Sequence, residues 1–228
     1  MKTIHTFLLF LAAGIFFSGC GSTLRFTASD APAQFPDHKS IAVLPVELVM
    51  TGKDYPKDWS EEKINKLETE QSQAYQAILY DALLRHYRTT SGVKIQSISK
   101  TMEILAEKRF EVKDIWEEDE TLLAQMLGVD AVVRAKIEQV RYMSDEQARG
   151  IAASTNAMLW GVPPYYAPYG GISPRTATLR TTCAIVEGKN SKVLWRMGVK
   201  RDAQWNNPPK QVARTVFNKM ARNFPYHR

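Results

Sequence analysis

Three segments in which apolar and polar residues alternate place the strongest constraint on the fold of this chain. In residues 131–137 the apolar side chains share one face of an extended strand, and Arg134 and Lys136 share the other. Residues 177–185 and 193–199 repeat the alternation, and the turn sequence EGKNS lies between them. We therefore expect three half-buried strands, the last two of which form a hairpin.

Two further strands are predicted earlier in the chain. The sequence SIAVLPVELVM at residues 40–50 is almost continuously apolar, which indicates a buried strand that ends or bends near Pro45. Residues 93–98 alternate well enough to form a short strand. In the alternating segment that follows, the phase is lost after residue 137, which predicts a bulge or strand end near Glu138.

Apolar residues at helical spacing and residues that favour helix ends predict the helices between these strands. The expected helices lie between a capping pair at Asp58 and Glu61 and the stop at Gly92, around Met102–Ala106, between a second capping pair at Asp114 and Glu117 and the stop at Gly128, and after Pro208 and Pro209. The order of elements is therefore β-α-β-α-α-β-β-β-α. This order predicts an α/β domain, or alternatively an α+β domain, with a mixed β-sheet flanked by helices.

The N-terminus has the layout of a secretory signal. Lys2 precedes an apolar run from Phe7 to Phe17, and small residues follow it. At about 1.5 Å per residue the run is too short to span a hydrocarbon core of roughly 30 Å. The sequence Phe17-Ser18-Gly19-Cys20 resembles the lipobox of bacterial lipoproteins, in which the cysteine is acylated and becomes the first residue of the mature chain. The alternative is an ordinary signal peptide followed by an incidental cysteine.

This interpretation divides the chain into three parts. Residues 1–19 form a lipoprotein signal peptide that is removed. Residues 20–39 are rich in small and turn-forming residues without a period, which indicates a lipidated, flexible tether. Residues 40–228 form a single α/β domain with a Tyr/Pro-rich insertion at 144–175. Several acyl chains on Cys20 would attach the protein durably to a membrane.

Charge and cysteine content exclude several classes of function. The formal charge of +6 falls to +5 once residues 1–19 are removed, since Lys2 is the only ionised side chain there. Because the basic residues alternate with acidic ones, we expect no nucleic-acid groove. Acylation of Cys20 leaves only Cys183, which rules out an intrachain disulfide.

No group of residues indicates catalysis, a metal or a cofactor other than the covalent lipid on Cys20. Cys183 lies on the apolar phase of its strand and is expected to be a buried, inert thiol. The acidic run at residues 117–120 lies near a predicted helix start, where the helix dipole stabilises acids. His38, His86 and His227 have no ligand spacing. We therefore expect a protein that is not an enzyme.

The candidate partner-binding residues lie in the Tyr/Pro-rich insertion. Aromatic rings held by prolines form rigid, amphipathic contact surface at little cost in entropy. The candidates are Trp160, Tyr165, Tyr166 and Tyr169. Two alternatives are that these rings pack onto their own domain and that the segment is disordered.

The order of several motifs resembles a broad group of bacterial envelope lipoproteins. The motifs are KSIAVLPVELV, a long helix, VKIQSISKTMEILAEKR, LLAQMLGVDAVVRAKIEQV and VLWRMGVKR. This pattern is similar to that of the CsgG-like and penicillin-binding-protein-activator-like lipoproteins, over roughly residues 39–224. The resemblance implies a nucleotide-free, non-catalytic periplasmic domain related to the amino-terminal domain of TolB. Val46 and Arg134 depart from the residues usual in that group.

The expected function is that of a non-catalytic structural or regulatory component of an envelope assembly. Because Gly21-Ser22 lacks an aspartate directly after Cys20, the enteric sorting rule favours the outer membrane, with the domain facing the periplasm. We expect an envelope protein as partner, and a homo-oligomer is possible in this class. The alternative is an oligomeric CsgG-like secretion channel, which requires membrane-inserted strands in residues 144–175. The sequence GVPPYYAPYGGISP in this segment alternates poorly and interrupts strands.

Overall fold

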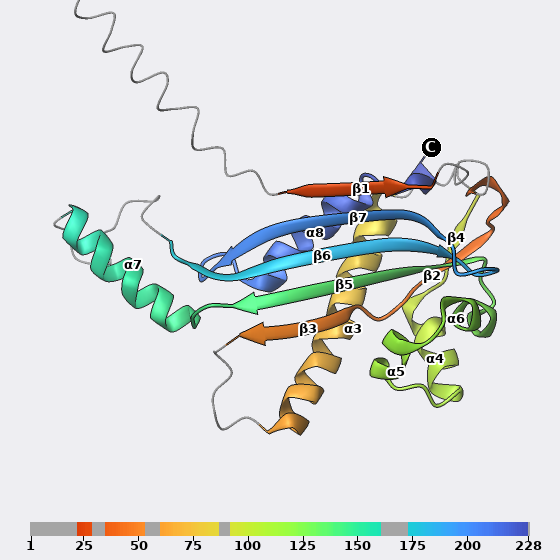
Figure 1. Cartoon of the computed structure of the whole chain (residues 1–228), viewed down its shortest axis with the longest axis horizontal. Coiled ribbons are helices and arrows are strands. Elements are labelled where there is room, and N and C mark those ends of the chain that lie inside the picture. The colour runs from red at the N-terminus through yellow and green to blue at the C-terminus, as the bar shows by residue number, and fades with distance from the viewer. Residues whose placement is uncertain (1–21, 29–34, 53–59, 87–91, 161–172, 228) are drawn as a thin grey trace, which may run out of the picture.

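The computed structural model describes residues 22–28, 35–52, 60–86, 92–160 and 173–227. Within these residues seven strands form one sheet, and the predicted mixed sheet flanked by helices is confirmed (Figure 1). The strands are β1 (Thr23–Thr27), β2 (Ser40–Val43), β3 (Glu47–Gly52), β4 (Lys94–Ile95), β5 (Ala131–Arg141), β6 (Arg175–Glu187) and β7 (Val193–Gln204). Their spatial order is β1-β7-β6-β5-β2-β4, and β3 also pairs with β5. The β1–β7, β7–β6 and β6–β5 pairs are antiparallel, whereas β2 and β3 run parallel to β5.

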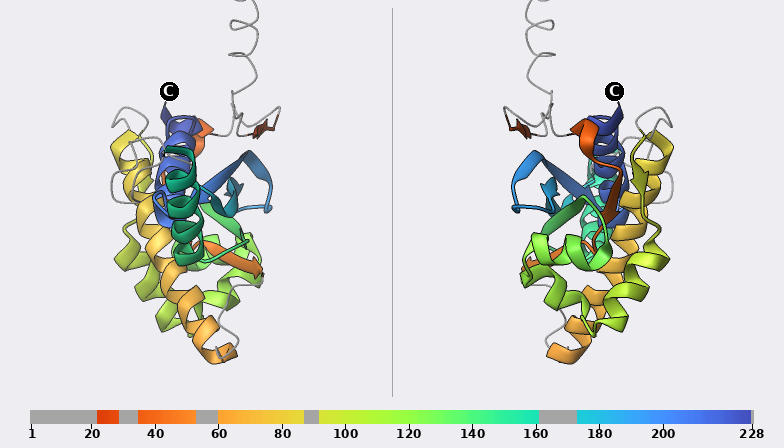
Figure 2. Two further views of the ribbon diagram at one scale, coloured as in Figure 1. Left: turned by 90° about the vertical axis from the view of Figure 1, so that its left-hand side faces the viewer. Right: turned by 90° about the vertical axis from the view of Figure 1, so that its right-hand side faces the viewer.

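The helices cover the two faces of the sheet unequally. The helices are α3 (Glu61–His86), α4 (Ile98–Glu107), α5 (Val112–Glu117), α6 (Glu120–Leu127), α7 (Asp145–Trp160) and α8 (Pro209–Ala221), with 3-10 turns at Phe35–Asp37 and Pro225–His227. Helices α3 and α8 lie side by side on one face (Figures 1 and 2). Helices α4 to α6 cover only one end of the other face, and α7 extends beyond the opposite end of the strands (Figure 1). No helix in the described residues has the length and apolarity needed to cross a bilayer.

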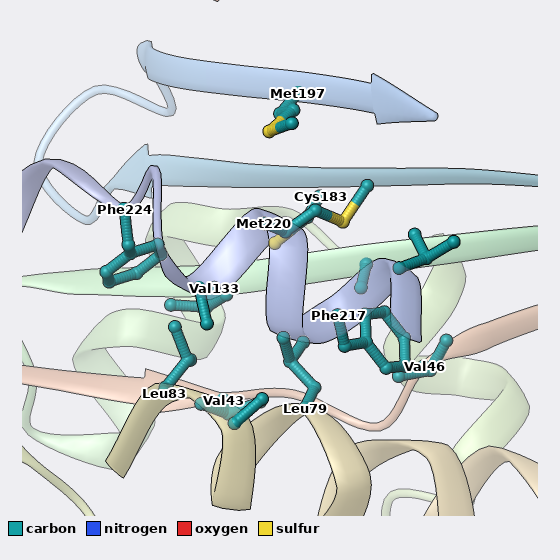
Figure 3. Close-up of a cluster of buried hydrophobic side chains, with 14 of the residues drawn as sticks. Val43, Val46, Leu79, Leu83, Val133, Cys183, Met197, Phe217, Met220 and Phe224 are labelled. Atoms are coloured by element: carbon teal, nitrogen blue, oxygen red, sulfur yellow. The ribbon is translucent and has the colours of Figure 1, made fainter. Parts of the chain in front are cut away.

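The main core lies between the sheet and the α3–α8 layer. Leu79 and Leu83 of α3 and Phe217 and Met220 of α8 point toward the apolar face of the strands (Figure 3). The strand side chains that meet them include Val43, Val133, Cys183 and Met197, and all of these residues are buried. The helix predicted after Pro208 and Pro209 is confirmed as α8, which begins one residue earlier than predicted, at Pro209.

A smaller core forms under α4 to α6. It contains Leu105 of α4, Ile115 of α5 and Leu123 of α6, which pack against the ends of β2, β5 and β6. The strand residues in this cluster are Ala42, Val132, Ala184 and Val186, and Leu44 joins them from the connection just after β2. These apolar residues lie on the otherwise polar face of the sheet and only at one end of it. The three short helices therefore find apolar surface to pack against only at that end.

One predicted helix start is wrong. Asp114 is not the N-cap of a helix with Glu117, because it is the third residue of α5 and forms a capping box with Glu111. The next helix, α6, is instead capped by Asp119, which accepts hydrogen bonds from the N–H groups of Thr121 and Leu122. The predicted stop at Gly128 is confirmed, since this residue adopts a left-handed conformation with φ of 65°.

Strand β5 shows neither a bulge nor an end at Glu138. Its pairing with β6 continues without a break from Ala131 opposite Glu187 to Arg141 opposite Ala177. The inward position after Ile137 is taken by Gln139, a polar side chain that is nevertheless buried, while Val140 lies on the opposite face of the strand. The break predicted near Pro45 is confirmed, because it separates β2 from β3 along the same partner strand.

The segment predicted as a flexible tether contains a strand. Residues 23–27 form β1, which pairs with β7 over its whole length. Residues 23–27 form a strand because Thr-Leu-Arg-Phe-Thr is rich in β-forming residues and because β7 would otherwise have an unpaired edge. Residues 145–160 of the predicted Tyr/Pro-rich insertion form helix α7.

Candidate functional site on the open face of the sheet

The residues predicted to carry function are mostly outside the described part of the chain. Cys20, Tyr165, Tyr166 and Tyr169 lie in segments that the structure does not describe. Trp160 is the last residue of α7, and its side chain is also outside the described set. The structure therefore leaves these predictions untested.

Helix α7 leads into the predicted contact segment. It begins at a reciprocal cap in which the N–H of Gln147 donates to Ser144 Oγ at 3.1 Å and the N–H of Ser144 donates to Gln147 Oε1 at 3.0 Å. The Ser-x-x-Gln spacing is a sequence pattern for a helix start that our sequence analysis missed. Ile151 and Met158 on this helix are exposed, and Gln147 and Ile151 are among the residues that line an open surface depression of about 590 Å³.

A second candidate site is the part of the sheet that α4 to α6 leave uncovered, which we call the open face. It is built by the outward phases of β1, β7 and β6. The register places Leu24 beside Gly198, Phe26 beside Arg196 and Arg180 beside Lys200. The side chains of Arg180, Arg196 and Lys200 are exposed. An apolar edge therefore adjoins a basic region on one surface.

The basic residues of the open face differ in how their charge is balanced. Near β3 and β5 the cations are paired, since Arg134 Nη1 lies 2.6 Å from Glu120 Oε1 and Lys136 Nζ lies 2.7 Å from Glu47 Oε1. On β6 and β7, Arg180, Arg196 and Lys200 form no ion pair with a described residue. Positive charge is therefore neutralised on one side of the open face and unbalanced toward β1.

Strand β1 forms the edge of the open face and exposes two large apolar side chains. The exposed fractions are 77% for Leu24 and 53% for Phe26. The alternate residues of β1 face α8, where Lys219 Nζ donates to Thr23 Oγ1 at 2.7 Å and Arg25 donates to the Asn223 side chain. One side of β1 is thus fixed to the domain, and the other side presents apolar surface to solvent.

A polar cluster joins the segment just before β2 to the C-terminal 3-10 turn. The Tyr226 hydroxyl lies 2.5 Å from His38 Nδ1, and both residues are buried. Burial lowers the pKa of His38, although the charges of Asp130 and Glu187 act in the opposite direction. Burial also raises the pKa of Tyr226, so that the phenol stays neutral in its hydrogen bond with the imidazole. This arrangement is a structural clamp, and its two central groups are held uncharged.

Asp130 forms the second part of the clamp. Its Oδ2 accepts hydrogen bonds from the N–H groups of Lys39 at 2.8 Å and Ser40 at 2.9 Å, and from the Ser40 hydroxyl at 3.3 Å. Burial alone would raise the pKa of Asp130, but these three donors outweigh burial and lower it. The carboxylate therefore fixes the point at which the chain enters β2.

Cys183 and the possible metal ligands were the sequence features closest to a reactive centre. Cys183 is fully buried as predicted, and burial raises the pKa of its thiol to about 12. A thiol with this pKa stays protonated at neutral pH and is a poor nucleophile. Within the described part of the chain no three His, Cys, Asp or Glu residues are grouped so that they could hold a metal ion.

No protein-family model matches the chain, and no curated protein matches it significantly. Among solved structures, the chain is similar to the PelC dodecamer from Paraburkholderia phytofirmans, with 13% identity, a TM-score of 0.43, and coverage of 89% of this chain and 96% of that one. It is also similar to the lipoprotein GNA1162 from Neisseria meningitidis, with 14% identity, a TM-score of 0.38, and coverage of 81% and 96%. The third similarity is to the C-terminal domain of LpoB from Salmonella enterica, with 8% identity, a TM-score of 0.33, and coverage of 73% and 82%. Because all three TM-scores lie below 0.5, none of these similarities assigns the chain to a family.

Proposed function

We propose that the protein is an outer-membrane lipoprotein that faces the periplasm and acts as a non-catalytic structural or regulatory component of an envelope assembly. One observation carries the proposal. The lipobox-like sequence Phe17-Ser18-Gly19-Cys20 is followed almost directly by folded structure, because β1 begins at Thr23. An acylated Cys20 would therefore hold the domain at the membrane surface through only a few residues. Such a placement suits a protein that works by contact with other envelope proteins.

The location and the partner surface rest on sequence. Gly21 and Ser22 lack the aspartate that favours inner-membrane retention under the enteric rule, which supports the outer membrane. The contact residues proposed are Trp160, the last residue of α7, and Tyr165, Tyr166 and Tyr169, which follow this helix in the sequence. A CsgG-like secretion channel is the less favoured alternative, because it requires strands in residues 144–175 and α7 forms a helix over much of that segment.

Replacing the anchor residue tests the lipoprotein assignment. We expect the wild-type chain to sediment with membranes and to begin at an acylated Cys20, as measured by mass spectrometry of the mature N-terminal peptide. The variant Cys20→Ser should keep its signal segment or enter the soluble envelope fraction, because it offers no thiol for the acyl chains. Cys183→Ala is the matched control, since it removes the other cysteine and should leave the anchor intact. An unacylated wild-type N-terminus would contradict the proposal.

Replacing the loop aromatics tests the protein-contact assignment. We expect crosslinking in cells to capture a specific envelope protein with the wild-type chain and to lose it with the double variant Tyr165→Ala/Tyr166→Ala. Large aromatic anchors carry much of the energy of an interface, so their removal should weaken capture at least tenfold. The melting temperature should not change. A large fall in melting temperature would show that these rings pack in their own domain, and an unchanged crosslinking pattern would place the contact elsewhere.

A further inference from the structure

We propose that the open face formed by β1, β7 and β6 rests on the anionic phospholipid surface of the membrane that carries the lipid anchor. The face is defined by Leu24, Phe26, Arg180, Arg196 and Lys200. It would fix the orientation of the domain, so that α3 and α8 point away from the bilayer (Figure 2). This inference rests on the proposed lipoprotein function and adds a binding surface and its ligand class.

The arrangement of side chains on this face matches that of an interfacial membrane contact. Leu24 and Phe26 form the outer row on β1, and the cations Arg196 and Lys200 form the next row on β7. Arg180 stands directly opposite Lys200 on β6. Apolar side chains that enter the headgroup region, flanked by basic groups that meet lipid phosphates, are the typical composition of such surfaces. Gly198 lies between Arg196 and Lys200 on β7, and because it has no side chain, nothing protrudes from the strand between these two cations.

The electrostatics of the face also call for an anionic ligand. Arg180 on β6 and Lys200 on β7 carry like charges and lie directly opposite each other on adjacent strands. Such a pair destabilises a sheet. Two acids adjoin these cations: Glu138 faces Arg180 from β5 without forming an ion pair, and Asp202, two residues along β7 from Lys200, is paired with Arg175. The cations farther across the face, Arg134 and Lys136, are already neutralised by Glu120 and Glu47. A surface of lipid phosphates would relieve the repulsion that remains.

The position of the anchor favours a bilayer over an acidic protein as the ligand. Two residues separate Cys20 from Thr23, and the three residue-to-residue steps, at up to about 3.5 Å each, reach about 10 Å. Leu24 and Phe26 therefore stay within a short distance of the membrane that holds Cys20. A tether of this length gives the lipid surface a high effective concentration at the open face, so that even a weak contact is populated.

The experiment uses the mature chain, residues 20–228, with Cys20→Ser, so that no acyl chain contributes to binding. Its partition into phosphatidylcholine vesicles with and without 30% phosphatidylglycerol is measured by sedimentation. We expect binding to the anionic vesicles that weakens as salt is raised, and little binding to the neutral ones. The variant Arg180→Gln/Arg196→Gln/Lys200→Gln should lower the partition coefficient about fivefold for each charge, or about one-hundredfold in all. The variant Leu24→Ser/Phe26→Ser keeps the three charges and should also lower the partition coefficient.

A matched control distinguishes the open face from net charge. Lys66→Gln/Lys210→Gln/Arg214→Gln removes the same charge from exposed positions on α3 and α8, and it should leave vesicle binding almost unchanged. Thermal melting confirms that each variant is folded. An equal loss of vesicle binding in the control variant, or no preference for anionic vesicles, would overturn the proposal. It would also be overturned if the open face bound a second copy of the chain or an acidic protein but bound no vesicles. Acylation of Cys20 is measured independently, so a failure here leaves the lipoprotein assignment standing.

Discussion

Phe217→Ala should lower the free energy of unfolding by about 3–5 kcal/mol. Phe217 is fully buried on α8 and points toward Val46 and the α3 side chains (Figure 3). Truncation removes the transfer free energy of the ring and leaves a cavity between two packed layers, which cannot collapse without moving α8. Since domains are stable by only about 5–15 kcal/mol, this loss is a large fraction of the total.

Urea unfolding followed by circular dichroism measures the effect of Phe217→Ala, and a melting curve should show a fall of roughly 6–20 °C. Gln211→Ala on the exposed side of the same helix is the matched control and should change stability by less than about 0.5 kcal/mol. A loss below about 1 kcal/mol for Phe217→Ala would mean that α8 does not form part of the main core.

Asp130→Ala should destabilise the domain by about 1.5–3 kcal/mol at neutral pH. The carboxylate is the acceptor for three donors from Lys39 and Ser40, and its loss leaves their N–H groups without this partner. The change acts where the chain enters β2, so hydrogen exchange at Lys39 and Ser40 should accelerate. Asp81→Asn, an exposed carboxyl on α3, serves as the control and should have little effect.

The pH dependence of Asp130→Asn provides a second measurement. The folded protein lowers the pKa of Asp130 below its unfolded value of about 3.9. The stabilisation from the charged form is therefore fully present above that pH and is lost as pH falls through the folded pKa. The stability difference between wild type and Asp130→Asn should be largest at pH 5 and above and should shrink toward pH 2. A difference that stays constant over this range would contradict the charge-based explanation.

The strands and the layer order could be predicted because their apolar residues repeat with the period of the structure. Val133 and Ile137 share the buried face of β5, and Met197 and Val199 share that of β7. The end of β5 could not be predicted in this way, because the inward position after Ile137 holds Gln139. A buried polar residue interrupts the apolar pattern without interrupting the backbone pairing, which depends on the partner strand.

The capping residues and β1 show a different limit. Several capping schemes satisfy the same spacing, because three acids lie close together in the sequence: Asp114, Glu117 and Asp119. Only the short connection between α5 and α6 selects Asp119 as the cap of α6. Strand β1 depends on pairing with β7, which lies more than 160 residues away. No local period could reveal this pairing, and the small residues around it favoured a tether.

The open face illustrates why a surface is harder to predict than a core. Arg180, Arg196 and Lys200 each occupy an ordinary outward position in its own strand, and the sequence indicates only that they are exposed. Their grouping with Leu24 and Phe26 follows from the register of three antiparallel strands. The sequence could point to Cys20 and the aromatic residues, because those features are local patterns.

The junction between β5 and β6 makes the segment between them a practical place to attach a reporter. Arg141 pairs with Ala177, and the N–H of Tyr142 donates to the carbonyl oxygen of Thr176 at 2.9 Å, so the chain leaves and re-enters the sheet at adjacent positions. Because the entropy of closing a loop grows only slowly with its length, an inserted fluorescent domain should cost the fold little.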